Sequence, residues 1–336
     1  LMQKNNTSIE KRKIGILTFT YGDNYGQRLQ NLAVQEILKL YGYDVYTIPQ
    51  VLPKNYVVKN HDRHNCFLEF DNENIKYYEY PIGRHRIPQG LQDFSFFVAG
   101  SDQIWSPYSN DVNSSLFLRF TSRGKRICLA PSMATSNIPW KKKLVYKLYF
   151  NGFDKISVRE EESARIIQKY TSKKVETLID PTLMFDAEFW QKYEKKPKYE
   201  VPKNYFLYYG LGNSIENYKV LDIASKHNCS VLFLKEGHKE FDIGPSEFLY
   251  LIRHASYVIT DSYHGTIFSI LYRKPFYHLV REQGGLDMSS RFDTLFSKLS
   301  INIDKMEQSE INYDMVFKKI EKERNKVRLY ISQYLL

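Results

Sequence analysis

Short apolar runs alternate along the chain with segments in which apolar residues return every three or four positions. The run at residues 14–19 is typical of a buried strand, and after it Leu29, Leu32, Ala33 and Ile37 share one helical face. Apolar runs predict further strands at residues 45–48, 94–99, 126–130, 156–158, 175–179, 205–209, 231–234, 257–259 and 275–280. Periodic segments predict helices at residues 29–40, 163–170, 220–226, 246–254, 267–272 and 292–299, before a long final helix. Strands that alternate with helices indicate an α/β fold with parallel sheets.

These α/β units fall into two blocks. Charged and turn residues at 192–203, among them Pro197 and Pro202, indicate a linker. A chain of 336 residues also exceeds the size at which single cores usually stop growing. We therefore expect two Rossmann-like, doubly wound domains that face a cleft, with a C-terminal helix that packs back across the joint. The predicted bounds are residues 12–190 with a loop-rich insertion at about 50–92, residues 203–310, and the helix at 311–336.

The composition indicates which kinds of partner the protein binds and in which compartment it resides. Lysine and arginine number 48 against 38 aspartate and glutamate, and this net charge of +10 predicts an anionic partner. Tyrosines are spread along the chain and no Cys/His finger is present, which disfavours nucleic acid. The three distant cysteines favour reduced thiols in a cytoplasmic location and disfavour a disulfide scaffold or a zinc site. No run approaches the roughly 20 apolar residues that span a bilayer.

The strongest candidate site is the polar segment at residues 260–266, between a predicted strand and a predicted helix. In open α/β sheets, ligands bind beyond the carboxyl ends of strands, where the free N–H groups of the next helix attract anions. Ser262 and His264 are placed to face such an anion, and an imidazole there can also exchange protons near neutral pH. The alternative role of His264 is to cap the helix.

Two other strand ends carry candidate residues. Arg159 follows a strand end, where a guanidinium can bind a carboxylate or phosphate through two hydrogen bonds; the alternative is a surface pair with Glu160. Asp102 and Trp105 follow the strand at 94–99. They predict either an acceptor base beside a sugar-stacking face or a helix cap beside a core tryptophan.

Weaker signals lie in three other segments. Asn24 lies in a turn between Gly22 and Gly26, where a ligand can approach the backbone at the start of the first helix. This turn matches neither the dinucleotide nor the phosphate-loop glycine motif, which disfavours NAD and ATP. Arg291 is either a second anion clamp or a solvated surface charge. Lysines interleaved with apolar residues at 140–150 are typical either of a helix at a membrane surface or of an ordinary amphipathic surface helix.

The motifs at these strand ends follow one another in order between residues 14 and 299. They are Asn24-Tyr25-Gly26 with Leu29-Gln30, Gly100-Ser101-Asp102-Gln103-Ile104-Trp105, Ile156-Ser157-Val158-Arg159-Glu160, Asp180-Pro181-Thr182-Leu183, Thr260-Asp261-Ser262-Tyr263-His264-Gly265-Thr266, Lys274-Pro275-Phe276 and Ser290-Arg291. In this combination the chain resembles the polysaccharide pyruvyl transferase family. The resemblance implies a fold similar to the two-domain GT-B glycosyltransferases. It also implies an enzyme that transfers pyruvate from phosphoenolpyruvate onto sugar hydroxyls, commonly as a cyclic ketal, with release of phosphate.

The resemblance implies roles for individual residues as well. His264 is the expected proton donor or the acid on the phosphate side, and Asp102 is expected to orient the acceptor hydroxyl. Arg159 is the third expected catalytic residue and would clamp the donor together with His264, one from each domain. The donor side is expected to comprise Arg159, Ser262, His264, Gly265, Thr266 and Arg291. The acceptor side is expected to comprise Asn24, Tyr25, Gln27, Asp102, Gln103 and Trp105. No cofactor or metal is expected besides phosphoenolpyruvate as donor substrate, and the acceptor is a sugar in a polysaccharide or in a lipid-linked oligosaccharide.

Two segments depart from the family pattern, namely Gln27-Arg28 and Pro131-Ser132-Met133-Ala134. Arg28 either makes a further contact with an anion or changes the shape of the substrate pocket so that it takes a different substrate. Two other functions stay open at this point. One is a glycosyltransferase that uses a nucleotide sugar in the same fold, and the other is a non-catalytic protein that binds anionic glycans.

Overall fold

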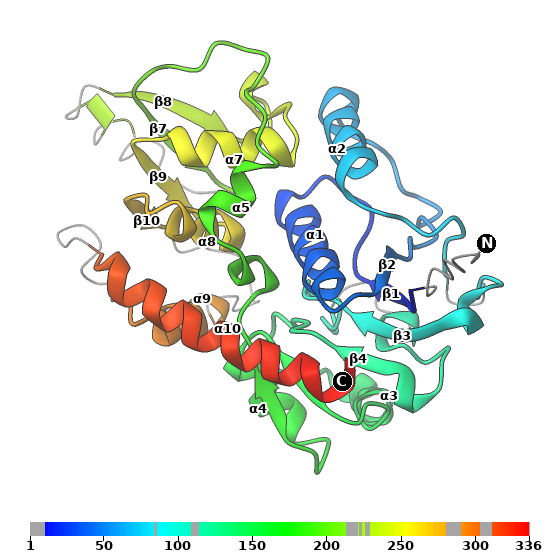
Figure 1. Cartoon of the computed structure of the whole chain (residues 1–336). Coiled ribbons are helices and arrows are strands. Elements are labelled where there is room, and N and C mark those ends of the chain that lie inside the picture. The colour runs from blue at the N-terminus through cyan, green and yellow to red at the C-terminus, as the bar shows by residue number, and fades with distance from the viewer. Residues whose placement is uncertain are drawn as a thin grey trace, which may run out of the picture.

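Two parallel sheets with the same strand order organise the chain (Figure 1). The structure is a computed structural model that describes residues 11–83, 86–108, 114–212, 221, 224–225, 229–279, 290–302 and 311–335. The first sheet has the order β2-β1-β3-β4, with β1 Lys13–Leu17, β2 Asp44–Thr47, β3 Phe94–Ala99 and β4 Arg126–Cys128. The second has the order β10-β9-β7-β8, with β7 Tyr205–Tyr209, β8 Ser230–Leu234, β9 Tyr257–Thr260 and β10 Phe276–His278. A separate parallel pair joins β5 Ile156–Val158 to β6 Val175–Thr177.

This order defines where each sheet can hold a ligand. In both sheets the first strand lies between the second and the third, so the chain reverses its winding direction between β1 and β3 and again between β7 and β9. Ligands of doubly wound sheets bind beyond the carboxyl ends of the strands at such switch points. The prediction of an α/β fold with two doubly wound parallel sheets is confirmed.

The helices connect and cover the strands. The α-helices are α1 Tyr25–Leu40, α2 His61–Asn74, α3 Lys143–Phe150, α4 Glu161–Gln168, α5 Ala187–Gln191, α7 Pro245–His254, α8 Tyr263–Leu271, α9 Ser290–Leu299 and α10 Tyr313–Leu335. Short 3-10 helices are η1 Leu91–Asp93, η2 Ser114–Phe117, η3 Arg123–Lys125, η4 Trp140–Lys142, η5 Pro181–Met184 and η6 Lys239–Phe241. Within the described ranges, no helix combines the length and the apolar character that a membrane span requires. The predicted helix at 220–226 lies mostly outside the described residues.

The predicted insertion at about 50–92 is not merely loop-rich, because it contains α2. The buried face of this helix combines Phe67 and Phe70 with two charged residues, Arg63 and Asp71. Asp71 forms an ion pair with the buried Arg28 of α1, with 3.0 Å between Oδ2 and Nε. Arg28 is therefore held by a carboxylate of the same half of the chain.

Helix α1 joins the two halves. Tyr25, in its first turn, is fully buried and stacks on Phe248 of α7 with 4.4 Å between ring centroids. Arg63 of α2 lies over the same Tyr25 ring and donates to the carbonyl oxygens of Phe241 and Ile243 in the second half. The halves are therefore packed together along α1, α2 and α7.

The C-terminal helix α10 also spans both halves (Figure 1). Near its start, the Tyr313 hydroxyl donates to the Lys274 carbonyl oxygen at 2.5 Å, beside β10. Near its end, the carbonyl of Leu335 accepts a hydrogen bond from Tyr43 at 3.5 Å, beside β2. The predicted return of the C-terminal helix across the joint is confirmed.

Trp105 and Trp140 offer a matched test of the core of the first half. Trp105 is fully buried and stacks on Phe117 with 5.2 Å between ring centroids, whereas Trp140 is 75% exposed. We expect Trp105→Ala to lower the free energy of unfolding by about 3–5 kcal/mol because it leaves a large cavity. Trp140→Ala should change it by no more than about 0.5 kcal/mol. Urea unfolding checks both values, and equal losses would contradict the assignment of Trp105 to the core.

Candidate functional site

Candidate residues from both halves meet at the switch points of the two sheets. Asp102 follows β3, and His264 follows β9 in the first turn of α8. His264 reaches across the joint to Asp180, at the start of η5 in the first half. Its Nε2 atom lies 3.4 Å from Asp180 Oδ2, within ion-pair range. The site is therefore assembled only when the two halves are packed together.

Asp180 is the centre of this group. Its carboxylate is fully buried and accepts a hydrogen bond from Arg159 Nη1 at 2.6 Å. Thr182 donates to Oδ1 through its backbone N–H at 2.9 Å and its hydroxyl at 2.6 Å, and the Ser101 hydroxyl donates to Oδ2 at 3.3 Å. Burial by itself would raise the pKa of Asp180, but the facing His264 and Arg159 hold that pKa well below its ordinary value. Asp180 is therefore ionised at neutral pH.

Arg159 is held by two carboxylates. Besides Asp180, its Nε atom contacts Glu160 Oε1 at 3.3 Å, and its guanidinium lies 4.5 Å from the centre of the Tyr263 ring. Burial is the largest single effect and opposes the charge of Arg159, but Asp180, Tyr263 and Glu160 together outweigh it, so the pKa of the guanidinium is raised. The predicted alternative of an Arg–Glu pair is thus present, but it is buried rather than on the surface. Direct contact of Arg159 with a donor stays a prediction.

The imidazole of His264 lies against the first turn of α1. A Cβ atom added to Gly26 would come within 1.9 Å of His264 Nδ1, so only glycine leaves room for the ring there. The His264 side chain is 12% exposed. Within the described part of the chain, its Nε2 atom is buried and makes no hydrogen bond, despite its closeness to Asp180. The ring is thus held in place by packing between Asp180 and Gly26.

The residues around His264 form the first turn of α8 and orient its side chain. Ser262 caps α8, because its hydroxyl accepts from the Gly265 N–H at 3.3 Å. The Thr266 hydroxyl donates to the Ser262 carbonyl oxygen at 3.1 Å. A Cβ atom at Gly265 would meet the Thr260 hydroxyl at 2.6 Å. These hydrogen bonds and the close packing fix the first turn of α8, whereas contact of these residues with a donor stays a prediction.

Two buried oxygen atoms lie near the candidate acceptor side. Asp102 Oδ1 accepts from the Gln103 N–H at 2.7 Å, whereas Asp102 Oδ2 has no hydrogen-bond partner among the described residues. Asn24 caps α1 by accepting from the Gln27 N–H at 3.2 Å, and the described residues give Gln27 Oε1 no partner either. Buried acceptors without donors are costly in a folded protein, so both oxygens are suited to receive hydroxyl groups of a ligand.

Two predicted acceptor residues, Tyr25 and Trp105, belong to the core instead. Trp105 donates through its indole N–H to the Leu116 carbonyl oxygen at 3.2 Å and presents no face to solvent. Tyr25 lies between aromatic rings, and burial raises its pKa to about 12. Both side chains are fully buried, so the core alternative holds for Trp105 and the predicted contact of Tyr25 with the acceptor is wrong.

Sequence reasoning left two central residues without a role, Asp180 and Tyr263. The Tyr263 ring lies under two guanidinium groups, those of Arg159 and of the buried Arg291 at 5.6 Å. Asp180 stands directly after a predicted strand in a quoted motif, which is the signal that could have identified it. Its partners lie 21 and 84 positions away along the chain, so no local pattern reveals them.

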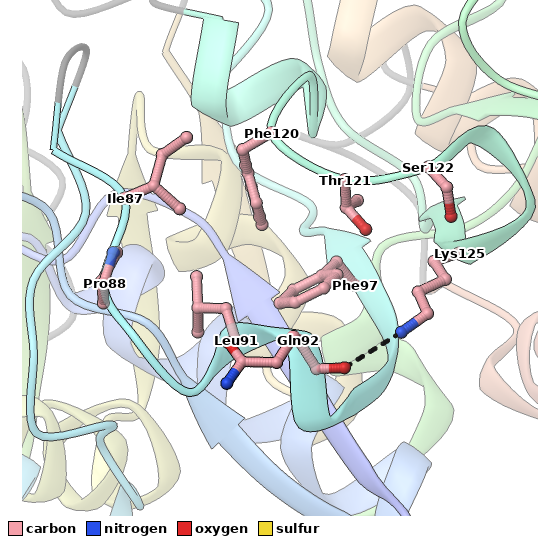
Figure 2. Close-up of a pocket in the computed structure, with 9 residues that line it drawn as sticks. All are labelled: Ile87, Pro88, Leu91, Gln92, Phe97, Phe120, Thr121, Ser122 and Lys125. Atoms are coloured by element: carbon pink, nitrogen blue, oxygen red, sulfur yellow. Dashed lines mark hydrogen bonds between the residues drawn. The ribbon is translucent and has the colours of Figure 1, made fainter.

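A cavity of about 360 Å³ lies elsewhere, beside η1 and β3 (Figure 2). It is lined by Ile87, Pro88, Leu91, Gln92, Phe97, Phe120, Thr121, Ser122 and Lys125. Figure 2 shows Lys125 at one side, where it donates to the Gln92 carbonyl oxygen at 3.3 Å. None of the candidate site residues lines this cavity. In the described ranges, no group of three or more histidine, cysteine, aspartate or glutamate residues is arranged to hold a metal ion.

Comparisons with known proteins bear on the family and the fold of the chain. A family model described as polysaccharide pyruvyl transferase matches residues 24–283. Among solved structures, the chain is similar to a UDP-GlcNAc 2-epimerase from Neisseria meningitidis bound to UDP-GlcNAc, with a TM-score of 0.52, 12% identity, and 95% of this chain and 99% of that chain covered. It is also similar to a proposed UDP-N-acetylglucosamine 2-epimerase from Listeria monocytogenes, with a TM-score of 0.55, 10% identity and 96% of each chain covered. At these identities the likeness shows the GT-B fold alone. No curated protein matches by sequence.

Asp180→Asn tests the buried ion pair. We expect it to lower the free energy of unfolding at pH 7 by about 3–5 kcal/mol, because Arg159 loses a buried counter-charge. Asp314→Asn is the matched control, since Asp314 pairs with Arg273 at 3.3 Å but its side chain is 81% exposed. The control should lose at most about 1 kcal/mol.

The pH dependence follows from the lowered pKa of Asp180. Stabilisation by the ionised carboxylate is complete above the unfolded pKa of about 3.9 and is lost as the pH falls through the lower folded pKa. The gap in unfolding free energy between the wild type and Asp180→Asn should therefore stay constant from pH 7 to about pH 5 and narrow below about pH 4. Urea unfolding across this range measures the gap, and a gap that closes already above pH 5 would contradict the assignment.

Proposed function

Because the chain belongs to the polysaccharide pyruvyl transferase family, we propose that it transfers the pyruvyl group of phosphoenolpyruvate to a sugar in a polysaccharide or lipid-linked oligosaccharide. The observation that carries the proposal is the contact of His264 with the buried Asp180 across the joint, at the switch points of both sheets. A proton-transfer group in the first turn of α8 suits an anionic substrate, because the N-terminal end of a helix favours negative charge.

In the proposed transfer, every proton and leaving group is accounted for. The methylene carbon of phosphoenolpyruvate takes up a proton and becomes a methyl group, and a sugar hydroxyl attacks the cation-like neighbouring carbon and loses its own proton. A second hydroxyl then displaces phosphate from that carbon, which closes the cyclic ketal. Phosphate leaves as hydrogen phosphate.

We assign the proton delivery to His264. One of its nitrogens lies 3.4 Å from the ionised Asp180, which orients the ring. Gly26 lets the ring approach the N-terminal end of α1, where the helix dipole favours the anionic donor. Arg159 acts as a positioning residue in this assignment, because it keeps Asp180 charged and in place.

We place the acceptor beside Asp102 and Gln27. Sugar hydroxyls are donors, and Asp102 Oδ2 and Gln27 Oε1 are buried acceptors without partners in the described structure. Gln103 follows Asp102 directly in the chain, and Asn24 accepts from the N–H of Gln27. Asp102 can then orient the attacking hydroxyl and take up its proton.

The first test is the thermal stability of the protein with phosphoenolpyruvate, with inorganic phosphate as the control anion, and with UDP-GlcNAc. A ligand present at 100 times its Kd stabilises the folded protein by about 2.7 kcal/mol. We expect stabilisation by phosphoenolpyruvate beyond that by phosphate, reduced in His264→Ala. Stabilisation by UDP-GlcNAc alone would overturn the proposed donor and favour a glycosyltransferase, whereas an undiminished response of His264→Ala would remove this residue from the donor site.

Gly26→Ala tests the position of His264 without changing that residue. The added methyl group would meet His264 Nδ1 at 1.9 Å, so the ring must move. We expect affinity for phosphoenolpyruvate to fall roughly tenfold, by about 1.4 kcal/mol. Gly124→Ala is the matched control, because nothing lies within 4 Å of its added Cβ. Titration by calorimetry measures both, and wild-type affinity in Gly26→Ala would contradict the role of the ring.

A further inference from the structure

Helix α3 and the preceding turn η4 present an apolar ridge to solvent. Trp140, Leu144 and Leu148 are 75%, 71% and 59% exposed. They stand four positions apart, so they lie along one face of the helix. Figure 1 places α3 on the outer side of the first sheet, away from β7–β10. Three large apolar side chains exposed in one row are unusual on a protein surface and mark a contact site.

The opposite face of α3 is firmly anchored. Tyr146 and Phe150 are buried, and the Tyr146 hydroxyl donates to the Trp105 carbonyl oxygen at 3.1 Å. The Phe150 ring lies 5.7 Å from that of Trp105. The apolar ridge is thus held rigidly in place by a helix that packs on Trp105, three residues after Asp102.

The charged side chains beside the apolar ridge are all positive. Lys141, Lys142, Lys143 and Lys147 are all exposed beside it. Between Asp111 and Asp154 the sequence has eight lysine and arginine residues and no aspartate or glutamate. The partner of this surface must therefore be anionic as well as apolar.

We propose that this surface binds the anionic face of a lipid bilayer. An amphipathic helix that lies in the plane of the interface buries its apolar side chains at the boundary between headgroups and acyl chains, and its lysines meet anionic headgroups. Tryptophan is favoured at that depth, and lysine side chains can reach outward to the headgroups. The helix has eight residues, so it attaches the protein reversibly and does not anchor it permanently.

Membrane contact would also bear on how the acceptor reaches Asp102, which lies in the loop after β3. Because α3 packs on Trp105, a bilayer beneath the ridge lies against the same half of the chain as the loop after β3. An oligosaccharide on a lipid carrier would then arrive at Asp102 from the membrane. This last step rests on the proposed function, whereas binding of the surface to lipid does not.

The test is flotation of the whole protein with phosphatidylcholine vesicles, with and without phosphatidylglycerol, in the absence of phosphoenolpyruvate. We expect binding only to vesicles that contain phosphatidylglycerol, and a strong loss of binding between about 0.1 M and about 1 M salt. Replacing Lys141, Lys143 and Lys147 by glutamine should weaken binding by roughly fivefold for each lysine close to the surface. The charge-matched control replaces Lys196, Lys318 and Lys322 by glutamine, and it should bind vesicles like the wild type.

The apolar ridge is tested in the same way. Trp140→Ser with Leu144→Ser and Leu148→Ser should abolish flotation. The control with Leu40→Ser, Val57→Ser and Leu329→Ser, which are 78%, 74% and 65% exposed, should retain it. Equal binding of the ridge variant and its control would overturn the proposal. The proposal would also be overturned if the wild type did not bind vesicles and instead formed a dimer that the ridge variant lost and its control kept. Thermal stabilisation by phosphoenolpyruvate should be unchanged in all of these variants, so the two proposals fail separately.

Discussion

The site depends on the ionised carboxylate of Asp180, which is buried where the two halves of the chain meet. A buried charge costs several kcal/mol unless counter-charges and hydrogen bonds compensate it. Arg159 supplies the counter-charge, and Thr182 and Ser101 donate hydrogen bonds to the same carboxylate. His264 then meets a carboxylate that is already fixed and charged. Chemistry at this place consequently requires the two halves to be in register, which links the fold directly to the function.

The packing of α1 sets that register. Tyr25 locks the first turn of α1 against Phe248 of the second half, at 4.4 Å between ring centroids. One residue later, Gly26 leaves the space that the imidazole of His264 fills. A large aromatic residue and a glycine, adjacent in sequence, thus determine how closely the two switch points approach. The long helix α10 crosses the same joint and adds contacts to strands of both halves.

Much of this fold was predictable from the sequence, but the site was only partly so. The predicted bounds of β3, β5 and β7 agree with the structure because fully buried strands are short, uninterrupted apolar runs. Helix α2 was missed because its buried face includes Arg63 and Asp71, whose burial depends on partners in other segments. The core position of Trp105 could not be read from sequence either, since a strand end does not reveal which way the next side chain turns. The domain bounds at residues 190 and 203 stay predictions.

The most direct test of the central claim follows the atoms of the donor. The protein is incubated in deuterium oxide with uniformly carbon-13-labelled phosphoenolpyruvate and a panel of glycans that carry neighbouring hydroxyls, and the products are analysed by mass spectrometry and NMR. The account predicts release of phosphate and a labelled ketal whose methyl group carries one solvent deuteron, with both products lost in His264→Ala. Labelled glycan without deuterium in its methyl group, or a product formed equally well by His264→Ala, would contradict proton delivery by this residue. Sugar transfer from UDP-GlcNAc with no label transfer would contradict pyruvyl transfer itself.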